Sequence, residues 1–354
     1  MTSRIDVGSA PVSPHARGPE MIVLGAACRD VAPDDPRGWR MGGGVSYSAL
    51  ATARLGLRTA AIFGLDAIAA AGGGPELGML TDAGVDLLRV PLKRGTIFYN
   101  LETPSGRVQT CVELGVPVPR VPLPDSWLAA PAWMIAPVSG ETTDEWAQAI
   151  PDHAFVTVAW QGLLRDLVPG NLTRRRPPEP SALLSRADLV GLSHFDVDPS
   201  TPISDLTRVM RPGAWLVITQ GQHGGLLTQV LGDGRTGEVL RYAPARSDGE
   251  IDPVGAGDTF LAALAATVIH RTLGGTRSRR GPLDLAFAAA AGALAVEKVG
   301  MEGAHVRADV IARMERRDIG RVADSSDGLR VNSFEVPPPA DPVAYPRSAA
   351  APTS

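Results

Sequence analysis

Lysine is almost absent from this sequence of 354 residues. Of its 34 lysine and arginine residues, only Lys93 and Lys298 are lysines. A phosphate-binding P-loop needs a lysine followed by serine or threonine, whereas Arg94 and Val299 follow these two. The Val-Ala-Ile-Lys strand of protein kinases is missing as well. The scarcity of lysine therefore excludes both of these nucleotide sites.

Cysteine is equally scarce, and no apolar run is long. Cys28 and Cys111 are too few for a disulfide framework or a zinc cluster, and both lie in apolar segments, so we expect small buried residues. No segment approaches the ~18 apolar residues of a membrane span, and residues 1–20 lack the apolar core of a signal peptide. The net charge of −4 does not favour binding to nucleic acid or to an anionic membrane. We therefore expect a cytoplasmic protein.

What is present is an alternation of short apolar runs with helical segments. This rhythm predicts an α/β fold with a mostly parallel sheet and helices on both faces. The expected strands span residues 21–25, 59–64, 133–137, 155–159, 189–192 and 215–219. The expected helices span residues 45–55, 76–83, 261–270, 283–299 and 304–317.

A hairpin interrupts this rhythm. Residues 96–101 and 107–112 flank a Thr-Pro-Ser-Gly turn at 103–106, which favours two antiparallel strands. Such a hairpin fits a small sheet that projects from the main one. We expect a disordered leader at 1–20, one domain over 21–318 and a disordered tail at 319–354, with the small sheet drawn from about 29–41 and 90–121.

Residues 252–260 read Asp-Pro-Val-Gly-Ala-Gly-Asp-Thr-Phe and run directly into an Ala- and Leu-rich helical segment. A glycine-rich turn at a helix start offers unpaired backbone N–H groups and a positive dipole end to an anion. Gly255 and Gly257 let the backbone approach a ligand closely. From these residues alone, Asp258 is either a helix-capping residue or a catalytic carboxylate.

The longer pattern resembles the C-terminal signature of the ribokinase (PfkB) family of carbohydrate and nucleoside kinases. This resemblance implies a ribokinase-like fold with a β-sheet lid, and ATP-dependent phosphoryl transfer to a hydroxyl group. It also implies that Asp258 is the catalytic base and that Gly255, Ala256 and Gly257 form the anion hole.

The acceptor side carries a second resemblance. Gly42 and Gly43 are similar to the family's N-terminal signature, and Tyr47 stands where the family usually has asparagine. Asp30 follows the strand that ends at Gly25, at the offset where the family grips substrate hydroxyls. The plainer alternatives are a flexible helix lead-in for the glycines and a solvated loop residue for Asp30.

Two shorter motifs look like the branch of the family that contains myo-inositol kinases. They are Ala-Pro-Val-x-x-Glu at 136–141 and Trp-Gln-Gly-Leu-Leu-Arg at 160–165. Gln161 and Arg165 suit a ring of hydroxyls, and the alternatives are a helix-start hydrogen bond and a surface charge. A cyclitol such as inositol is therefore the first expectation for the acceptor, with a sugar or nucleoside next.

The donor side is implied by residues 219–224, which resemble the family's Thr-x-Gly-x-x-Gly nucleotide segment. ATP, Mg²⁺ and a monovalent cation are the cofactors that the resemblance implies. Many relatives have Asn-x-x-Glu for the metal, where this chain has Ser193 and Asp196, so Asp196 is expected to reach Mg²⁺ through water. The ATP-binding residues implied are Thr219, Gly221, Gly224, Asp252, Gly255, Gly257 and, on a helix wall beside adenine, Ala288.

Two other classes of protein are weighed against a kinase. A sugar- or nucleotide-binding protein that has lost catalysis is suggested by the altered residues at 193–196, although such a protein has no need of Asp258. A dehydrogenase is disfavoured because no Gly-x-Gly-x-x-Gly follows the first strand. The expected partners are a small-molecule substrate and a second copy of the chain, paired through the lid.

Overall fold

The computed structural model describes residues 18–103, 106–274 and 283–316. Nearly all of the predicted leader and all of the predicted tail lie outside these residues. None of the helices within the described ranges is long and apolar enough to cross a membrane.

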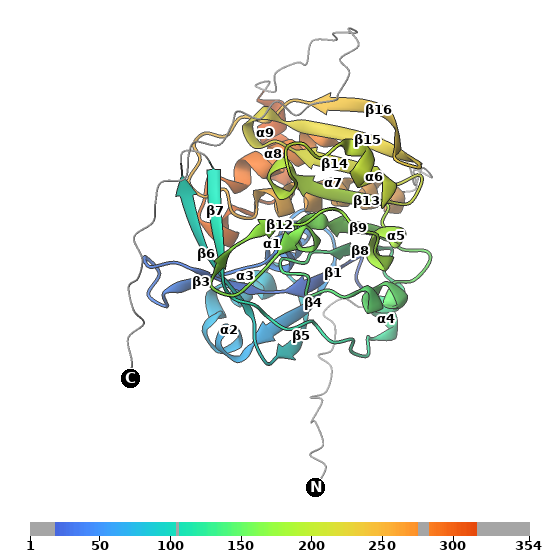
Figure 1. Cartoon of the computed structure of the whole chain (residues 1–354). Helices are drawn as coiled ribbons and strands as arrows, with labels where there is room; N and C mark the ends of the chain where they lie inside the picture. Colours follow the sequence, from blue (N-terminus) through green and yellow to red (C-terminus); the bar gives the residue numbers. More distant parts are fainter. Residues whose placement is uncertain (1–17, 104–105, 275–282, 317–354) are drawn as a thin grey trace.

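A nine-stranded sheet runs through the middle of the molecule, in the order β16-β15-β14-β13-β9-β8-β1-β4-β5 (Figure 1). The seven strands from β14 to β5 are parallel, as predicted, and β15 and β16 add an antiparallel hairpin that was not predicted. The strands are β1 (Met21–Ala26), β4 (Thr59–Asp66), β5 (Asp86–Leu92), β8 (Ala132–Ile135), β9 (Phe155–Ala159), β13 (Leu189–Ser193), β14 (Trp215–Thr219), β15 (Gly225–Gly232) and β16 (Arg235–Tyr242).

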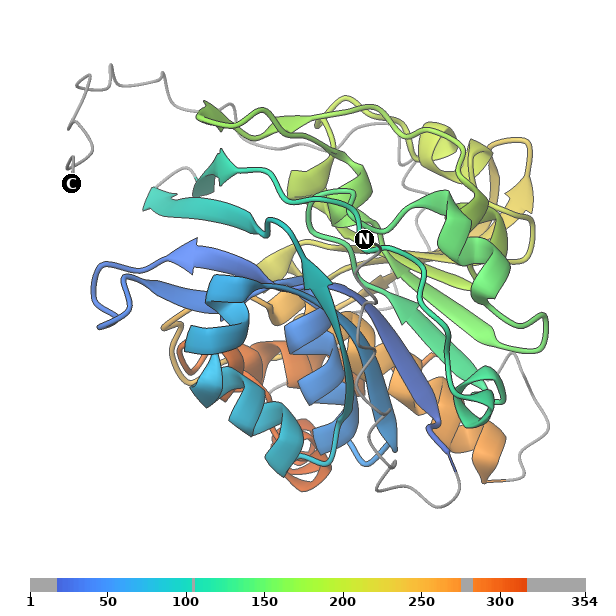
Figure 2. The same ribbon diagram turned by 90° about the horizontal axis from the view of Figure 1, so that it is seen from below.

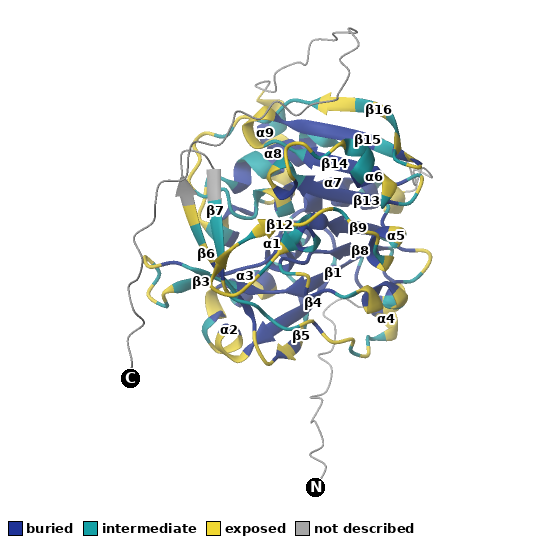
Figure 3. Cartoon of the chain, viewed as in Figure 1, coloured by how far each residue is buried: buried dark blue, intermediate teal, exposed yellow. Residues whose placement is uncertain are grey.

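Successive residues of the central strands alternate between two hydrophobic cores, one on each face. On β1, Met21 and Val23 belong to one core, whereas Ile22 and Leu24 belong to the other. A strand buried on both faces reads as a continuous apolar run, which is why these strands could be recognised from the sequence. Figure 3 shows the middle strands as buried along their length.

Helices cover both faces of the sheet. Figure 2 shows the blue and orange helices on one side and the green segments on the other. The first group contains α1 (Gly44–Arg54), α2 (Ala67–Gly72), α3 (Gly74–Asp82), α7 (Ala256–Leu273), α8 (Leu285–Ala295) and α9 (Arg307–Glu315). The second contains α4 (Asp125–Leu128), η1 (Asp144–Ala149), α5 (Ala182–Arg186) and α6 (Ile203–Arg208).

Helix α8 ends earlier than predicted. The Val296 carbonyl, just past its last residue, accepts hydrogen bonds from the backbone N–H groups of Ile251 and Asp252. The chain therefore leaves the helix to pair with the segment before α7. A helical sequence pattern cannot predict this end of the helix, because the contact joins residues far apart in the chain.

A five-stranded sheet stands apart from the main one, in the order β11-β7-β6-β2-β3. The predicted hairpin is confirmed as β6 and β7, and residues 28–42 supply two further strands. The short β11 was not predicted, because two residues carry no readable pattern. The strands are β2 (Cys28–Val31), β3 (Trp39–Gly42), β6 (Thr96–Thr103), β7 (Gly106–Glu113) and β11 (Asn171–Leu172). A two-stranded sheet joins β10 (Arg165–Asp166) to β12 (Arg174–Arg175).

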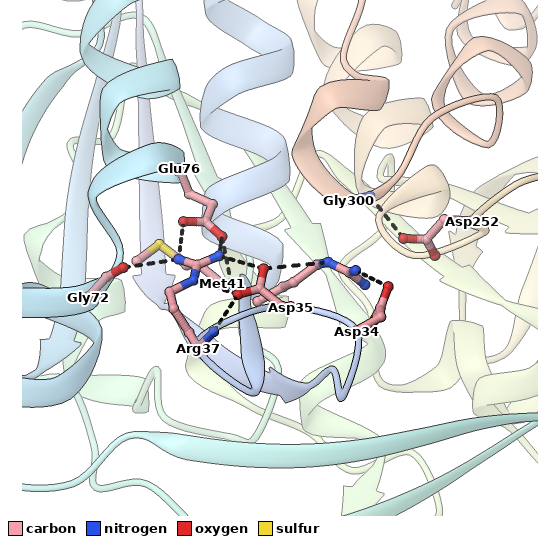
Figure 4. A network of polar contacts seen from close by, with 9 residues as sticks. Asp34, Asp35, Arg37, Met41, Gly72, Glu76, Asp252 and Gly300 are labelled. Carbon is pink, nitrogen blue, oxygen red and sulfur yellow. Dashed lines mark hydrogen bonds and ion pairs between the residues drawn. The ribbon is translucent and has the colours of Figure 1, made fainter.

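Arg37 holds one edge of the small sheet to the main body (Figure 4). Its Nη1 donates to Glu76 Oε2 at 2.8 Å and to the Gly72 carbonyl at 3.0 Å, while Nη2 donates to Glu76 Oε1 at 2.7 Å. Its guanidinium also lies 4.7 Å from the centre of the Trp39 ring. A bidentate pair of this kind is directional, so it orients the β2–β3 connection against α2 and α3.

Candidate active site

Asp258 is the third residue of α7, and it does not cap that helix. The residue before the helix is Gly255, with φ of 78°, and no side chain caps the helix start. Asp258 is half-buried, and among the described residues none donates a hydrogen bond to its carboxylate. Burial raises the pKa of this carboxyl to about 7; Arg165 opposes the rise and Asp196 adds to it. The structure therefore does not support the alternative that Asp258 is a helix-capping residue.

Two glycines bring the start of α1 against Asp258 and the ends of β1 and β8. A Cβ on Gly44 would lie 2.9 Å from the Ala136 carbonyl oxygen and 3.0 Å from Asp258 Oδ1. Gly43 has φ of 100°, and a Cβ there would lie 2.7 Å from the Ala26 carbonyl oxygen. These positions demand glycine, because any larger residue would push the carboxylate or the backbone away.

Asp30 lies on β2, against the first glycine of the same run. A Cβ on Gly42 would meet Asp30 Oδ2 at 2.1 Å. Asn100 Nδ2 donates to Asp30 Oδ1 at 3.0 Å, and the Cys28 thiol lies 3.9 Å from both carboxylate oxygens. Burial, with the charge of Asp30 second, raises the pKa of the Cys28 thiol well above its usual value, so it stays protonated. Both cysteines are buried and unpaired, as predicted.

Arg165, on β10, contacts both the loop after β8 and the small sheet. Its Nη1 donates to the Val138 carbonyl at 3.1 Å, and its guanidinium lies 5.6 Å from the centre of the Phe98 ring on the small sheet. Burial lowers its pKa, and the negative groups around it oppose that effect. Those groups are the carboxylates of Asp196, Asp258 and Asp30. A single positive group thus interacts electrostatically with three carboxylates of the candidate site.

Asp196 is buried and bonded through both of its oxygens. Gln161 Nε2 donates to Oδ1 at 3.0 Å, and the Ser193 backbone N–H donates to Oδ2 at 2.7 Å. Burial raises the pKa of this carboxyl, while Arg165 lowers it. The structure therefore joins the predicted metal residue to the predicted substrate residue Gln161.

The described residues hold no cluster of three or more His, Cys, Asp or Glu side chains suited to a metal ion. A carboxylate oxygen has two lone pairs, so Asp196 can still accept from a water bound to a cation. Mg²⁺ usually keeps several waters and takes its other ligands from substrate phosphates. The residues present fit an ion held in that way and do not fit an ion enclosed by protein ligands.

Tyr47 and Asp252 support the turn before α7. A Cβ on Gly255 would lie 2.2 Å from the Tyr47 ring, so the ring packs directly beneath this turn. Asp252 accepts from the Val254 N–H at 2.9 Å and from the Gly300 N–H at 2.8 Å (Figure 4). Burial raises the pKa of Tyr47, and Asp30 adds to this more than any other charge. Tyr47 thus fills the space under the turn at Gly255.

The segment after β14 turns back sharply through η4 (Gly221–His223). Gly221 and Gly224 have φ of 55° and 78°, and the Gln220 N–H donates to the Gly224 carbonyl at 2.7 Å. The Thr219 carbonyl lies 3.1 Å from His194 Nδ1, on η3 (His194–Asp196). The predicted nucleotide segment therefore lies beside the predicted metal residue, because β13 and β14 are neighbours.

Ala288 is the predicted residue that the structure keeps out of the site. It is 0% exposed and belongs to the main hydrophobic core, so its side chain cannot contact a ligand. The half-buried Gly292 on the same helix lies nearer the turn at residues 255–257, since a Cβ on Gly292 would be 3.6 Å from the Ala256 carbonyl oxygen. Helix periodicity alone could not tell which face of this Ala-rich helix turns inward.

Glu141 has a role that the sequence motif did not reveal. It is 3% exposed, and its carboxylate accepts from the backbone N–H groups of Ala26, Val138 and Ser139 at 2.8–3.2 Å. It thereby ties the end of β1 to the loop after β8, which are the two backbone segments beside Gly43 and Gly44. Asn100 was also missed, although a polar residue on one face of the predicted hairpin was a usable signal.

The sequence of residues 182–305 matches the model of the pfkB family carbohydrate kinases. This range includes Asp196, residues 219–224 and the turn at residues 255–257. No curated protein is significantly similar in sequence.

Solved structures of the same fold cover nearly the whole described chain. One is a pyrophosphate-dependent kinase in the ribokinase family, complexed with a pyrophosphate analog and myo-inositol, with 18% identity and a TM-score of 0.58; the match covers 82% of this chain and 99% of that one. Ribokinase from Giardia lamblia has 16% identity and a TM-score of 0.61, with coverage of 84% and 98%. Arabidopsis thaliana ribokinase, complexed with ribose and ATP, has 17% identity and a TM-score of 0.56, with coverage of 84% and 99%. The predicted ribokinase-like fold is confirmed.

Proposed function

We propose that this chain, with its ribokinase-like fold and its pfkB sequence pattern over residues 182–305, is a kinase for a hydroxyl group of a small polyol. The observation that carries the proposal is the state of Asp258. Its carboxylate is half-buried beside Gly44, accepts no hydrogen bond from the described residues and has a pKa of about 7. A carboxylate in that condition is suited to accept a proton near neutral pH.

The proposed reaction is an in-line displacement at the terminal phosphorus of the donor. The acceptor oxygen forms a bond to phosphorus while the bond from phosphorus to the bridging oxygen breaks, and Asp258 accepts the hydroxyl proton. Backbone N–H groups of Gly255, Ala256 and Gly257 stabilise the negative charge of the transferred group. Asp30 and Arg165 hold the acceptor in line, and positioning of this kind supplies much of the rate.

ATP is the proposed donor, held by residues 219–224 and by the turn that Asp252 stabilises. We place the wall beside the adenine ring at Gly292 instead of Ala288, because Gly292 has exposed surface and Ala288 has none. Asp196 would contact Mg²⁺ through water, and the ion would neutralise charge on the phosphates. A monovalent cation is also part of the proposal.

The proposed acceptor class is a small polyol, with a cyclitol first and a sugar or nucleoside next. Asp30, Arg165 and Gln161 offer a carboxylate, a guanidinium and an amide, and such groups pair with several hydroxyls at once. The likeness to a kinase complexed with myo-inositol supports this order.

An acceptor panel tests the function. The full chain is incubated with Mg²⁺, with ATP or pyrophosphate as donor, and with cyclitols, pentoses, hexoses or nucleosides. We expect ADP release above the hydrolysis background with one class of acceptor, and a phosphorylated product by mass spectrometry. ATP binding without turnover on any acceptor would contradict the proposal and favour a catalytically inactive binding protein.

A second copy of the chain is the proposed macromolecular partner, at the face of the small sheet opposite Asp30. Register and strand alternation put exposed apolar residues on that face: Tyr99, Leu101, Val112 and Leu172. Sedimentation equilibrium measures this directly. A cytoplasmic location is proposed because both cysteines are buried and unpaired.

A further inference from the structure

A row of hydrogen bonds runs from Asp30 across the inner face of the small sheet. Asn100 on β6 is the direct cross-strand partner of Gln109 on β7. Asn100 Nδ2 donates to Asp30 Oδ1 at 3.0 Å, and Gln109 Nε2 donates to Asn100 Oδ1 at 2.8 Å. Thr173 Oγ1, just after β11, lies 3.3 Å from Gln109 Oε1. The row therefore begins at the proposed acceptor carboxylate and crosses β6 and β7 to the far edge of the sheet.

The direction of these bonds is set by chemistry. Asp30 can only accept while it is ionised, so Asn100 must present its NH₂ group to it. The carbonyl of Asn100 then faces Gln109, which must present its own NH₂ group. The hydroxyl of Thr173 completes the sequence by donating to Gln109. Each amide thus has one orientation that satisfies both of its neighbours.

Asp30 is confined on its other sides. Gly42 leaves only enough room for the carboxylate, since a Cβ there would overlap Oδ2, and the Cys28 thiol lies 3.9 Å away. The hydrogen bond from Asn100 therefore constrains the torsion of the carboxylate more than the thiol contact does, because a hydrogen bond from an amide to an ionised group is stronger and more directional.

We propose that Asn100 is a positioning residue for Asp30, that Gln109 orients Asn100, and that this pair determines which hydroxyls of a polyol Asp30 can hold. The inference rests on the proposed kinase function and extends it to acceptor selection. It differs from a role in sheet stability, because it requires that a change in amide chemistry without a change in shape alters acceptor recognition.

Three variants of the full chain test this. N100D keeps the shape but sets a second carboxylate against Asp30. Q109E keeps the shape of Gln109 but removes the donor to Asn100, which favours an Asn100 amide turned with its oxygen toward Asp30. T110V, on the adjacent residue of β7 with its side chain on the opposite face, is the matched control. For each variant we measure acceptor KM, kcat and donor KM, the ranking of acceptors, and acceptor Kd by calorimetry without donor.

We expect N100D and Q109E to raise acceptor KM and Kd roughly tenfold to a hundredfold, with donor KM unchanged and the acceptor ranking altered. In N100D two adjacent carboxylates can share one proton, so the KM defect relative to wild type should shrink as pH falls from 8 toward 5. T110V should match wild type, and all three variants should melt within a few degrees of it.

The outcomes separate this inference from the function beneath it. If wild type phosphorylates an acceptor and N100D binds that acceptor within twofold of wild type, the inference is overturned and the function stands. If wild type binds a polyol without turnover and N100D loses that binding, the kinase function fails and the positioning role stands. A wild-type chain that neither binds nor phosphorylates any acceptor overturns both.

Discussion

Asp30 and Asp258 are two carboxylates of one site, and their surroundings differ in kind. Asp30 lies on a strand, where Asn100 donates to it and Gly42 confines it. Asp258 lies at a helix start, where no described residue donates to it and burial raises its pKa to about 7. Hydrogen bonds fix a carboxylate in place and suit it to binding, whereas burial without them raises its affinity for a proton. This difference supports the proposed roles, which are substrate binding for Asp30 and proton transfer for Asp258.

The largest expected effect follows from removing the base. D258N should lower kcat by roughly a thousandfold while changing acceptor KM little, because an amide cannot accept the proton. D30N should do the reverse and raise acceptor KM by roughly tenfold to a hundredfold, with a smaller loss in kcat. Steady-state kinetics with the acceptor found in the panel measures both.

Stability provides the control for this pair. Ionisation of a buried carboxylate with a raised pKa costs stability at pH 8, above both its folded and unfolded pKa, and D258N removes that cost. D258N should therefore melt no lower than wild type at pH 8. An inactive D258N chain that is also clearly less stable would point to a structural role, and undiminished turnover would remove Asp258 from the mechanism.

Substitutions of Gly42 and Gly44 test the difference between Asp30 and Asp258 with a smaller expected effect. Neither Gly42 nor Gly44 has a φ in the left-handed range, so the backbone torsions admit alanine at both, and its methyl group is opposed only by neighbouring atoms. G42A pushes against Asp30 and should raise acceptor KM, whereas G44A pushes against Asp258 and the Ala136 carbonyl and should lower kcat, each roughly tenfold. Identical kinetic defects in the two variants would argue that the carboxylates share one role.

The smallest effect expected is a shift in pH dependence. The proposed base must be ionised, so kcat/KM for the acceptor should rise with pH through a midpoint near 7. Arg165 lowers the pKa of Asp258, and its removal in R165Q should move the midpoint to higher pH. R165K retains the charge and serves as the control, with a midpoint close to that of wild type. A midpoint that is the same in R165Q as in wild type would remove Asp258 as the titrating group.

Much of the architecture could be predicted because it is encoded locally. A strand buried on both faces is an apolar run wherever it occurs, and a Gly-Ala-Gly turn before an Ala-rich segment signals a helix start. The β15–β16 hairpin was missed although its signal was present. Asp233 and Gly234 have φ of 53° and 75°, as the Asp-Gly pair of a tight hairpin requires. An Asp-Gly pair is a hairpin signal that can be recognised from the sequence.

The site was only partly predictable, because contacts between distant residues carry no local pattern. Asn100 meets Asp30 across 70 positions, and Glu141 meets Ala26 across 115. Ala288 was misjudged for the same reason, since the inward face of an Ala-rich helix is chosen by what packs on it. Gln161 and Asp196 were each proposed for a ligand, and only the fold revealed that they bond to each other.

By itself, the sequence determined the alternation of strands and helices, the hairpin of the small sheet and the turn that ends in Asp258. Each of these depends on residues close together in the chain, whose backbone preferences and burial patterns do not need a partner. The tertiary structure alone decided that Asp258 accepts no hydrogen bond from its described neighbours while Asp30 is held by Asn100. The chemistry of a carboxylate depends on what surrounds it, and folding brings those surroundings from segments far apart in the chain.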